Sequence, residues 1–450
     1  MSMPPPLRRV LIVSPHFPPV NAPDLQRVRM SLPHYRAAGW EPIVLCVGDA
    51  WQEGTREPEL ERTLPDDIMI IRCPAFPRRW TRWLGVGNLG LRCWLHFLLI
   101  GSRLIRREKI DLVFFSNTQF VTFTLGRIWR AWHGVPYVLD MQDPWRTDYY
   151  SRAGSRRPPG GWKYHFARLS AWLLEGWSFG RVSGVMSVSP DYIADLRDRY
   201  RHLAIVPAAT IRFGASRRDL ADAMALPPST HSYSRRPGEI HVLYTGAAGP
   251  VTPHAVTVLF TGLQRYRAAH PERAARFRFH FYGTSYVGPG EGKNAVLPLA
   301  EALGVGDLVD EIPHRLGHLE CLQLQREADI LLLPGSSDLA YSPSKIYPYY
   351  IAERPILGVV FRHSVLEKIL FDLQCAVMVP FGENESPDQA CALLADFFDA
   401  AIAGFPPGLL PARRDDYFST HFLAESLTHA QGRLFDAALR HGSPPPCPAL

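Results

Sequence analysis

Short apolar segments alternate with helix-like segments along nearly the whole chain, and this alternation limits the fold more than any other feature. At the start, residues 9–14 and 41–47 have the pattern of strands, and residues 25–38 between them have the pattern of a helix. Strands joined by a helix in this way lie parallel in one sheet, with a right-handed crossover. The opening therefore predicts a doubly wound α/β domain.

The alternation occurs twice, with an irregular stretch between the two series. In the first series, further strands are predicted at 68–72, 110–116, 135–141 and 184–189. In the second series, strands are predicted at 240–245, 276–282, 308–312, 329–333, 356–361 and 376–379. We therefore expect a Rossmann-like domain over residues 1–206, a connection over 207–238, a second Rossmann-like domain over 239–415, and a helix over 416–440 that crosses back to the first domain.

Composition narrows the class of protein. The 450 residues suffice for two or three domains, and 46% hydrophobic with 20% charged residues is typical of a globular chain. The seven cysteines are scattered without a Cys-x-x-Cys pair, which argues for reduced thiols and against structural zinc. Without a signal-peptide pattern or a bilayer-spanning apolar run, we expect a cytoplasmic protein, with peripheral attachment to the inner face of a membrane as the alternative. A net charge of +6 without a recognised motif argues against nucleic-acid binding.

A segment rich in hydroxyl groups lies between the strand predicted at 329–333 and a helix predicted to end before Pro355. The first-turn N–H groups of a helix are unpaired and its dipole is positive there, so such an entry can bind an anion. Ser342, Ser344 and Lys345 would add hydroxyl donors and a positive charge suited to a diphosphate. The alternative is an ordinary capped helix with a solvated Lys345.

The same segment carries a family resemblance. The run Ser-Pro-Ser-Lys-Ile-Tyr-Pro-Tyr-Tyr-Ile-Ala-Glu-Arg-Pro-Ile, beginning at Ser342, resembles the nucleotide-sugar signature of GT-B glycosyltransferases grouped with family 4. The resemblance implies an α/β chain with the GT-B fold, in which two doubly wound Rossmann-like domains face a central cleft, and it places Tyr347 among the donor-binding residues. Two positions depart from the family, because Pro348 stands where a ribose-binding Glu is usual and Glu353 stands where a Gly is usual.

Two glycines extend the resemblance within the second domain. Gly246 follows the strand predicted at 240–245, where a small residue lets the backbone approach a phosphate, and Gly283 follows the strand predicted at 276–282. A tight turn explains Gly283 equally well. Residues 249–253, Gly-Pro-Val-Thr-Pro, lack the arginine and lysine that the family carries there. Lys345 is therefore predicted to be the principal cation for the donor diphosphate.

The candidate catalytic residues lie in the first domain. The segment 139–145, Leu-Asp-Met-Gln-Asp-Pro-Trp, resembles an acidic motif of the family, and a carboxylate there can orient an acceptor hydroxyl or take its proton. We therefore assign Asp143 and Asp140 as candidate catalytic residues, with a capped loop as the alternative. The resemblance further assigns His16 and Arg27 to the loop that contacts the acceptor, with a solvated helix arginine as the alternative for Arg27.

Two segments, 77–109 and 162–177, combine basic and aromatic residues. Such a surface fits an anionic membrane interface, and the alternative is a set of core helices with solvated arginines.

The family resemblance implies a glycosyltransferase of hexosyltransferase type. It would move a sugar from a nucleotide-diphosphate donor to a glycan or lipid-linked acceptor, as in envelope polysaccharide synthesis. The resemblance implies no cofactor and no metal, because helix dipoles and basic side chains neutralise the leaving diphosphate. A non-catalytic GT-B binding or assembly protein, or a sugar-nucleotide epimerase, is the alternative function.

Overall fold

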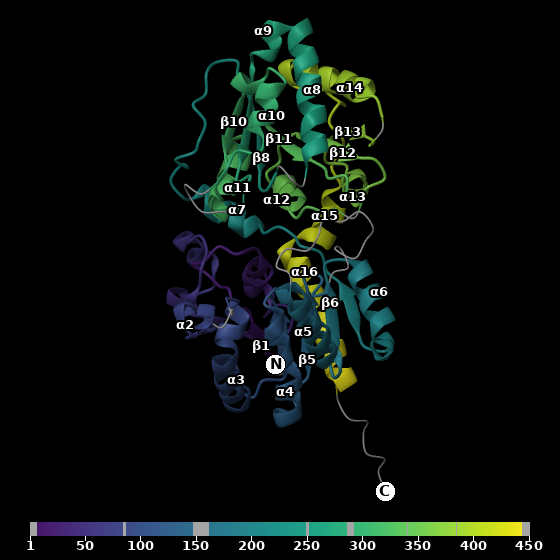
Figure 1. Cartoon of the computed structure of the whole chain (residues 1–450). Helices are drawn as coiled ribbons and strands as arrows, with labels where there is room; N and C mark the ends of the chain where they lie inside the picture. The colour runs from purple at the N-terminus through teal and green to yellow at the C-terminus, as the bar shows by residue number, and fades with distance from the viewer. Residues whose placement is uncertain are drawn as a thin grey trace, which may run out of the picture. The chain divides into compact units, whose positions relative to one another are not determined.

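The computed structural model describes residues 7–83, 87–146, 162–248, 252–285, 292–339, 341–383 and 385–442 (Figure 1). The chain forms two compact units. The first unit is Met1–Phe213 together with Ala424–Leu450, and the second is Gly214–Leu423. Each unit holds a parallel sheet flanked by helices, which confirms the predicted α/β fold class.

The first unit is built on a seven-stranded parallel sheet in the order β3-β2-β1-β4-β5-β6-β7. The strands are β1 (Arg8–Val13), β2 (Trp40–Val47), β3 (Met69–Cys73), β4 (Leu112–Ser116), β5 (Tyr137–Met141), β6 (Gly184–Ser187) and β7 (Ala208–Thr210). Strands β2 and β3 lie on one side of β1 and strands β4 to β7 on the other, so the order in which strands are added reverses between β1 and β4. In doubly wound sheets, ligands bind outside the carboxyl ends of the strands at such a switch point.

Helices cover both faces of this sheet. They are α1 (Gln26–Ser31), α2 (Arg78–Trp83), α3 (Leu89–Arg107), α4 (Thr124–His133), α5 (Trp162–Phe179), α6 (Pro190–Arg199) and α16 (Ala424–Gly442). Alternate residues of β1 point to opposite faces. Leu11 and Val13 share one hydrophobic cluster with side chains of α3 and α4, whereas Val10 and Ile12 share another with α1 and α16. The core therefore lies in two layers, one on each side of the strands.

Short 3-10 segments join several of these elements. They are Pro23–Leu25, Leu32–His34, Asp49–Trp51, Pro58–Thr63, Phe120–Phe123 and Arg201–Ala204. The helix predicted over residues 25–38 is accordingly too long, because α1 ends at Ser31 and a 3-10 turn replaces its continuation. Pro33 lies in that turn and has no N–H to donate, which stops an α-helix from running through it.

The second unit is built on a six-stranded parallel sheet in the order β10-β9-β8-β11-β12-β13. The strands are β8 (Ile240–Thr245), β9 (Phe277–Tyr282), β10 (Val309–Ile312), β11 (Ile330–Pro334), β12 (Ile356–Phe361) and β13 (Val377–Phe381). Its switch point lies between β8 and β11, because β8 pairs with both β9 and β11. The two sheets thus share one winding order, apart from the extra β7 at the edge of the first.

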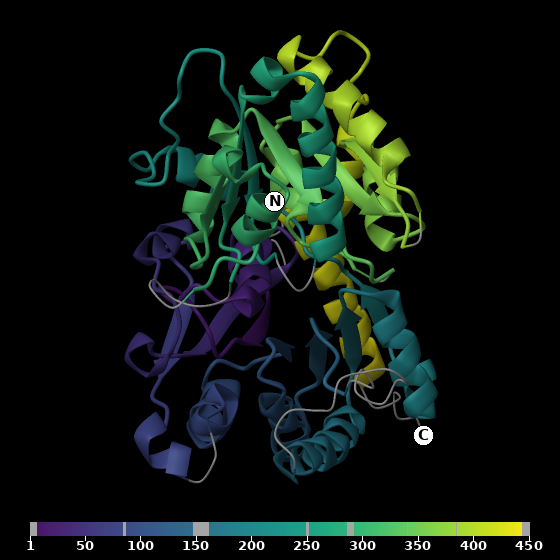
Figure 2. The same ribbon diagram turned by 45° about the horizontal axis from the view of Figure 1, so that its top comes forward.

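Helices also flank the second sheet. They are α7 (Arg217–Met224), α8 (Pro253–Ala269), α9 (Pro271–Ala274), α10 (Leu297–Ala302), α11 (His318–Glu327), α12 (Ile346–Ile351), α13 (Val365–Leu373), α14 (Asp388–Ile402) and α15 (Asp415–Phe422), with a 3-10 turn at Gly306–Leu308. Figure 2 shows α8 crossing one face of the sheet, where Phe260, Phe279 and Phe398 share the main hydrophobic cluster of this unit.

Residues 207–238, predicted to connect the two domains, instead belong to the two units themselves. Residues 207–238 are not an irregular connection, because β7 pairs with β6 in the first sheet and α7 packs on α11 in the second unit. The side-chain amide of Gln323 donates to the carbonyl oxygens of Ala223, Leu226 and Pro227, which fastens this segment to α11. Strand pairing and these hydrogen bonds give residues 207–238 regular structure, which their weak apolar periodicity did not predict.

Residues 416–440 form two helices rather than one. In the second unit, Phe418 of α15 stacks on Tyr350, with ring centroids 3.9 Å apart. Leu423 then takes an extended conformation and ends α15. In the first unit, Gln431 of α16 accepts a hydrogen bond from the Tyr35 hydroxyl and donates one to Ser31.

Candidate active site

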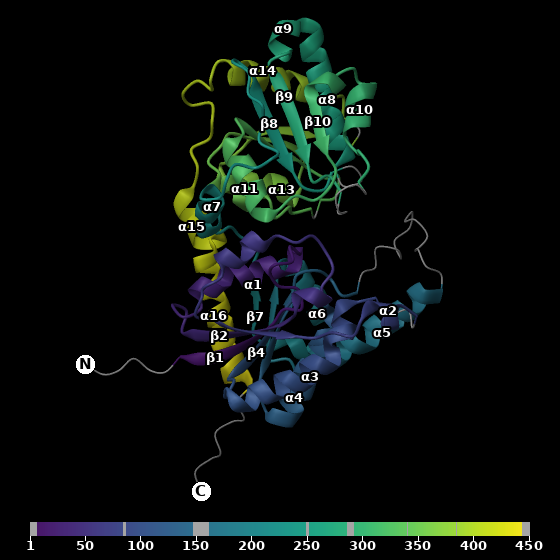
Figure 3. The same cartoon turned by 90° about the vertical axis from the view of Figure 1, so that its left-hand side faces the viewer.

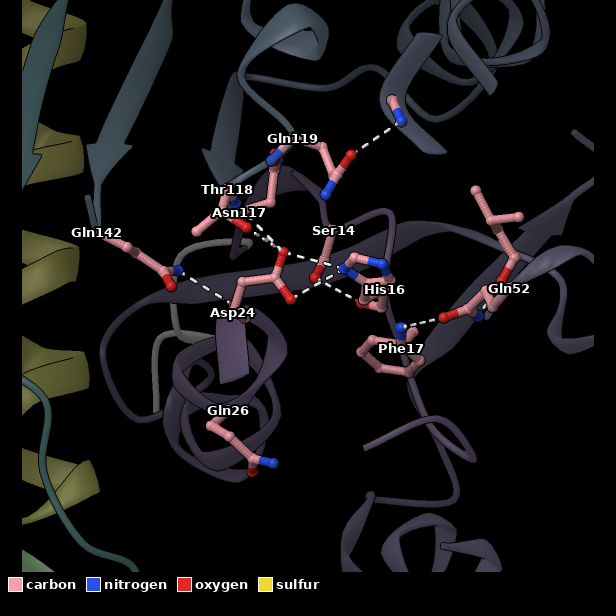
Figure 4. A network of polar contacts seen from close by, with 12 residues as sticks. Ser14, His16, Phe17, Asp24, Gln26, Gln52, Asn117, Thr118, Gln119 and Gln142 are labelled. Carbon is pink, nitrogen blue, oxygen red and sulfur yellow. Dashed lines mark hydrogen bonds and ion pairs between the residues drawn. The ribbon is translucent and has the colours of Figure 1, made fainter. Parts of the chain in front are cut away.

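A buried polar network lies at the switch point of the first sheet, where β1 and β4 end (Figure 4). His16 follows β1, and its Nδ1 atom lies 3.0 Å and 3.1 Å from the two carboxylate oxygens of Asp24. Thr118, which follows β4, donates to Oδ2 of Asp24 from its backbone N–H at 3.2 Å and from its hydroxyl at 3.0 Å. Asp24 is thus held by groups from two neighbouring strand ends.

The protonation of this network follows from its hydrogen bonds. Burial by itself would raise the pKa of Asp24, but the hydrogen bond and charge of His16 and the two hydrogen bonds from Thr118 outweigh burial and hold the pKa below its ordinary value. An ionised Asp24 can only accept, so Nδ1 of His16 carries the proton and donates it. In the neutral form of this ring, the lone pair lies on Nε2. A partly exposed imidazole oriented by a buried carboxylate is an arrangement suited to a general base.

Three further amides hold this network in place (Figure 4). The side chain of Asn117 donates to the carbonyl oxygen of Val13 at 3.0 Å, which joins the ends of β4 and β1. Gln142 donates to the backbone carbonyl of Asp24 at 3.1 Å. Gln52 accepts from the backbone N–H of Phe17 at 3.1 Å and so fixes the loop that carries His16. The ring of His16 is therefore positioned by three separate segments of the chain.

Asp140 and Arg27, two of the predicted site residues, form an internal ion pair. Arg27 Nε lies 2.9 Å from Oδ2 of Asp140, and both side chains are buried. The guanidinium also donates to the carbonyl oxygen of Ile211 at 2.7 Å and lies over the ring of Phe213. Asp140 further accepts from Ser116 at 2.7 Å. Both side chains thus bind partners within the unit and tie α1 and β5 to the residues after β7.

Asp143 lies in a different setting from Asp140. It is exposed, just beyond the carboxyl end of β5. Partial burial of its carboxyl group and the nearby charge of Asp24 raise the pKa of Asp143 above its ordinary value. Asp143 directly follows Gln142, whose side chain donates to the backbone carbonyl of Asp24, so Asp143 is adjacent in the chain to a residue of the His16 network. Of the two predicted catalytic carboxylates, Asp143 is the one accessible to a substrate.

In the second unit, a lysine lies over a glycine at the end of β8. Nζ of Lys345 donates to the Tyr244 hydroxyl at 2.7 Å and lies 4.2 Å from the centre of that ring. Burial lowers the pKa of Lys345 to about 7. Gly246 has φ +124°, and a Cβ atom there would lie only 2.6 Å from Nζ of Lys345. The lysine therefore reaches the switch point of the second sheet because Gly246 has no side chain.

The loops after β8 and β9 meet beside this lysine. The backbone N–H of Gly246 donates to the carbonyl oxygen of Tyr282 at 2.7 Å, and that of Ala248 donates to Thr284 at 3.2 Å. Gly283 lies between these contacts with φ +74°, and its own N–H donates to Ile312 at 2.7 Å. The structure thus brings together Gly246, Gly283 and Lys345 from three segments. Residues 249–251 lie outside the described residues.

The remaining predicted donor residues divide between surface and interior. Ser342 and Ser344 are exposed, whereas Tyr347 is buried and stacks on Phe422, with ring centroids 4.8 Å apart. Tyr347 therefore packs within the unit. The helix that follows Lys345 spans only Ile346–Ile351, which is too short for a strong dipole at its N-terminus. Any binding of an anion here would depend on Lys345 and the nearby backbone.

The two departures from the family signature have different consequences in the structure. Pro348 lies inside α12, and its side chain cannot form a hydrogen bond to a ribose. Glu353 takes φ +56°, a left-handed conformation that glycine adopts at less cost. The backbone at Glu353 therefore has a conformation that suits the glycine usual there. At position 348, by contrast, Pro348 offers no replacement for the usual glutamate carboxylate.

Sequence analysis missed Asp24, Asn117 and Thr118 as site residues. Asp24 directly precedes the helix predicted over residues 25–38, yet it makes no side-chain capping hydrogen bond and instead binds His16 and Thr118. The position of Asn117 and Thr118 in the sequence could have identified them. Both directly follow the strand predicted at 110–116, and polar residues at the carboxyl ends of parallel strands often bind ligands. Among the residues that the structure describes, no group of three or more His, Cys, Asp or Glu side chains could hold a metal ion.

Comparison with known proteins agrees with this architecture. Residues 26–213 match the model of the glycosyl transferase 4-like domain. A UDP-forming α,α-trehalose-phosphate synthase from Burkholderia xenovorans is 12% identical, with a TM-score of 0.52 over 96% of this chain and 99% of that chain. The N-terminal domain of trehalose-6-phosphate phosphatase from Candida albicans is also 12% identical, with a TM-score of 0.51 over 96% and 95%. At these identities the likeness shows the GT-B fold alone. No curated protein matches the chain.

Proposed function

Because the chain is a divergent, family-4-like GT-B protein whose residues 26–213 match a glycosyl transferase 4-like domain, we propose that it is a glycosyltransferase. It moves a sugar, of hexosyl type, from a nucleotide-diphosphate donor to an acceptor hydroxyl. The acceptor is a lipid-linked or polysaccharide glycan of the kind assembled for a cell envelope. A lipid-linked acceptor would bring the protein to the inner face of a membrane.

The observation that carries this proposal is the position of Lys345 over Gly246. A cation and an open backbone at the switch point of a doubly wound sheet suit a diphosphate, which needs charge and close approach together. Before the ligand binds, the uncharged Tyr244 hydroxyl accepts a hydrogen bond from Nζ of Lys345. A diphosphate would offer Nζ a charged acceptor, and that stronger bond would favour the ammonium form.

The first unit supplies the group that activates the acceptor. In our proposal, Nε2 of His16 takes the proton of the acceptor hydroxyl, whose oxygen forms a bond to the anomeric carbon. The bond between that carbon and the diphosphate oxygen breaks, and the nucleoside diphosphate leaves with the electron pair. Asp24 stabilises the imidazolium that forms, as a buried carboxylate does for a histidine base.

Asp143 has an orienting role in this proposal. Its exposed carboxylate, close enough to Asp24 to sense its charge, would accept a hydrogen bond from the acceptor. The reaction would need no metal, because Lys345 neutralises the leaving diphosphate. A chelator should therefore leave turnover unchanged.

A second candidate function rests on Pro348. A chain without a ribose-binding carboxylate at this position could bind nucleotide sugars without turnover and serve as an assembly partner. Turnover of any nucleotide sugar would separate the transferase from this binding protein.

The donor class can be tested by thermal unfolding with a panel of nucleotide sugars, nucleoside diphosphates and nucleosides. A ligand at 100 times its dissociation constant stabilises the folded state by about 2.7 kcal/mol. We expect the diphosphate-containing ligands to raise the unfolding temperature more than their nucleosides. If no member of the panel raises it, the donor site that we propose is wrong.

A further inference from the structure

One face of the first unit carries large apolar side chains that point into solvent. They belong to three helices, and each is between 44% and 61% exposed. They are Leu91, Leu95 and Leu99 on α3, Trp132 on α4, and Leu169, Trp172, Leu173 and Trp177 on α5. Single exposed leucines are ordinary, but a contiguous apolar patch marks an interaction site.

Helix α3 shows why these positions are unusual. Cys93, Phe97 and Gly101 face the core, where Gly101 packs against the ring of Trp129. A helix with one buried stripe normally carries polar residues on its opposite side. In α3, the outward stripe is instead Leu91, Leu95 and Leu99, spaced four residues apart and therefore aligned. Between Leu91 and Leu99, the outer face of this helix is thus apolar.

Helix α4 packs against both α3 and α5, so the three helices are neighbours (Figure 3). The indole N–H of Trp94 on α3 donates to the hydroxyl of Thr124, the first residue of α4, at 2.8 Å. Arg127 on α4 lies 4.1 Å from the ring centre of Trp177 on α5 and donates to its carbonyl oxygen at 3.1 Å. We call the exposed side chains of α3, α4 and α5 the apolar face.

The charges on these helices have one sign. Helices α3 and α4 contain no Asp or Glu, whereas α3 ends in the exposed Arg103, Arg106 and Arg107. The one acidic residue of α5, Glu175, is 0% exposed and binds Arg199 and Tyr200 in the interior. The apolar face is therefore bordered by cationic groups and by no exposed carboxylate from its own helices.

We infer that the apolar face docks this protein on an anionic lipid bilayer. Leucine and tryptophan would enter the interface between headgroups and acyl chains, and the arginines would lie at the level of lipid phosphates. Among the described residues, no helix combines the length and apolarity needed to cross a bilayer. The side chains of Trp80, Arg82, Trp83, Trp162, Lys163, Tyr164 and Arg168, from the predicted basic-aromatic segments, lie outside the described part and are not needed here.

This inference goes beyond the proposed reaction, because lipid binding requires neither donor nor acceptor. Vesicle binding of the full chain tests it directly. We expect sedimentation with vesicles of phosphatidylcholine mixed with phosphatidylglycerol, weak binding to phosphatidylcholine alone, and a blue shift of tryptophan fluorescence on binding. Raising the salt from about 0.1 M to about 1 M shortens the screening length from about 10 Å to about 3 Å and should release much of the protein.

Two sets of variants locate the contact. The triple variant Leu95→Ser, Leu99→Ser, Trp172→Ser should lower partitioning by about 100-fold, at about fivefold for each half-buried side chain. Its matched control replaces three exposed apolar residues of the second unit, Met224→Ser, Leu409→Ser and Leu410→Ser, and should bind as the wild type does. The pair Arg103→Glu, Arg106→Glu should lose about 25-fold or more on anionic vesicles only. Arg217→Glu with Arg236→Glu, both exposed in the second unit, is its control.

Three results would overturn the inference. One is equal binding to neutral and anionic vesicles, or no binding to either. Another is unchanged partitioning of the triple serine variant. The third is a dimer of the wild-type chain in sedimentation velocity that the triple variant converts to monomer, because a second copy would then be what covers the apolar face.

Discussion

The side chain of Lys345 occupies the space that a Cβ atom on Gly246 would need. Nζ lies 2.6 Å and Cε lies 3.1 Å from that position, and the backbone of Gly246 has φ +124°. The backbone conformation of Gly246 therefore favours glycine, and a side chain there would also displace the end of the Lys345 side chain. This relationship joins the loop after β8 to the residue before α12 and forms the cationic part of the proposed donor site.

Gly246→Ala should destabilise the second unit and weaken diphosphate binding. The left-handed conformation costs an ordinary residue about 1–3 kcal/mol, and the collision would displace Lys345 in addition. Gly404→Ala is the matched control, because Gly404 also has positive φ but meets nothing within 4 Å. Denaturant titration and calorimetry would measure both effects. Equal losses in the two variants, with diphosphate affinity intact, would show that the contact with Lys345 is unimportant.

Binding of a nucleotide sugar should weaken as the pH rises above neutrality. In the free protein the pKa of Lys345 is lowered to about 7, so the lysine is mostly neutral at higher pH, whereas a diphosphate binds its ammonium form. Binding then takes up a proton, and at about pH 8.5 only about 3% of the lysine is already charged. The affinity should be roughly 30-fold lower there than at about pH 5.5, where the lysine is nearly all charged.

Two substitutions separate this effect from other titrations. Lys345→Arg should bind with little dependence on pH, because a guanidinium stays charged throughout this range. Lys345→Ala should bind nucleoside diphosphates roughly 10- to 150-fold more weakly while nucleoside binding changes little. Calorimetry at several pH values gives both numbers. If both ligands lose affinity equally, or neither does, Lys345 is not the donor cation.

His16 and Asp24 should behave as one catalytic unit. His16→Ala and Asp24→Asn should each lower turnover roughly 100-fold or more, because the proton acceptor needs both the ring and its orientation. The double variant should be no slower than His16→Ala alone, as expected for groups that act only together. Thr118→Val removes one hydrogen bond to Asp24 and should have a smaller effect. Multiplicative losses in the double variant would contradict a shared role.

Asp143→Asn should lower turnover with the acceptor roughly 100-fold while donor affinity stays nearly unchanged. The exposed carboxylate would orient the acceptor, whereas the diphosphate would bind the second unit. Asp195→Asn, an exposed carboxylate on α6 of the same unit, serves as the control. An unchanged rate in a folded Asp143→Asn protein would return Asp143 to a structural role in its loop.

The sequence predicted the fold well because the fold depends on local patterns. The strand predicted at 356–361 coincides with β12, and the other predicted strands lie within a few residues of observed ones, since apolar runs between turns identify buried parallel strands. The helix predicted over 25–38 was too long because Pro33 stops the α-helix, although the apolar periodicity continues beyond it. The boundary at 206 failed because β7 is only three residues long and is recognised by its pairing with β6.

The site was harder to predict because its contacts join distant segments. Asp24 resembles a local helix cap, and its partner Thr118 lies 94 residues away. Arg27 and Asp140 are charged residues of the kind found in binding sites, yet they form an ion pair with each other inside the unit. Tyr347 fits the family signature, but its side chain packs on Phe422, which no short-range pattern indicates. Lys345 was predicted from its place at a helix entry and from the family signature, but its contact with Tyr244 could be seen only in the fold.

Sugar transfer itself is the most direct test of the account. The measurement is release of nucleoside diphosphate from a panel of nucleotide sugars by the wild-type protein and by His16→Ala and Lys345→Ala, with lipid-linked and polysaccharide acceptors and with a chelator present. We predict that at least one nucleotide sugar is consumed with transfer of its sugar, that chelation has no effect, and that both variants are slower by roughly 100-fold and 10-fold or more, respectively. Stable binding of nucleotide sugars without any turnover would contradict the account and leave a GT-B protein that binds but does not transfer.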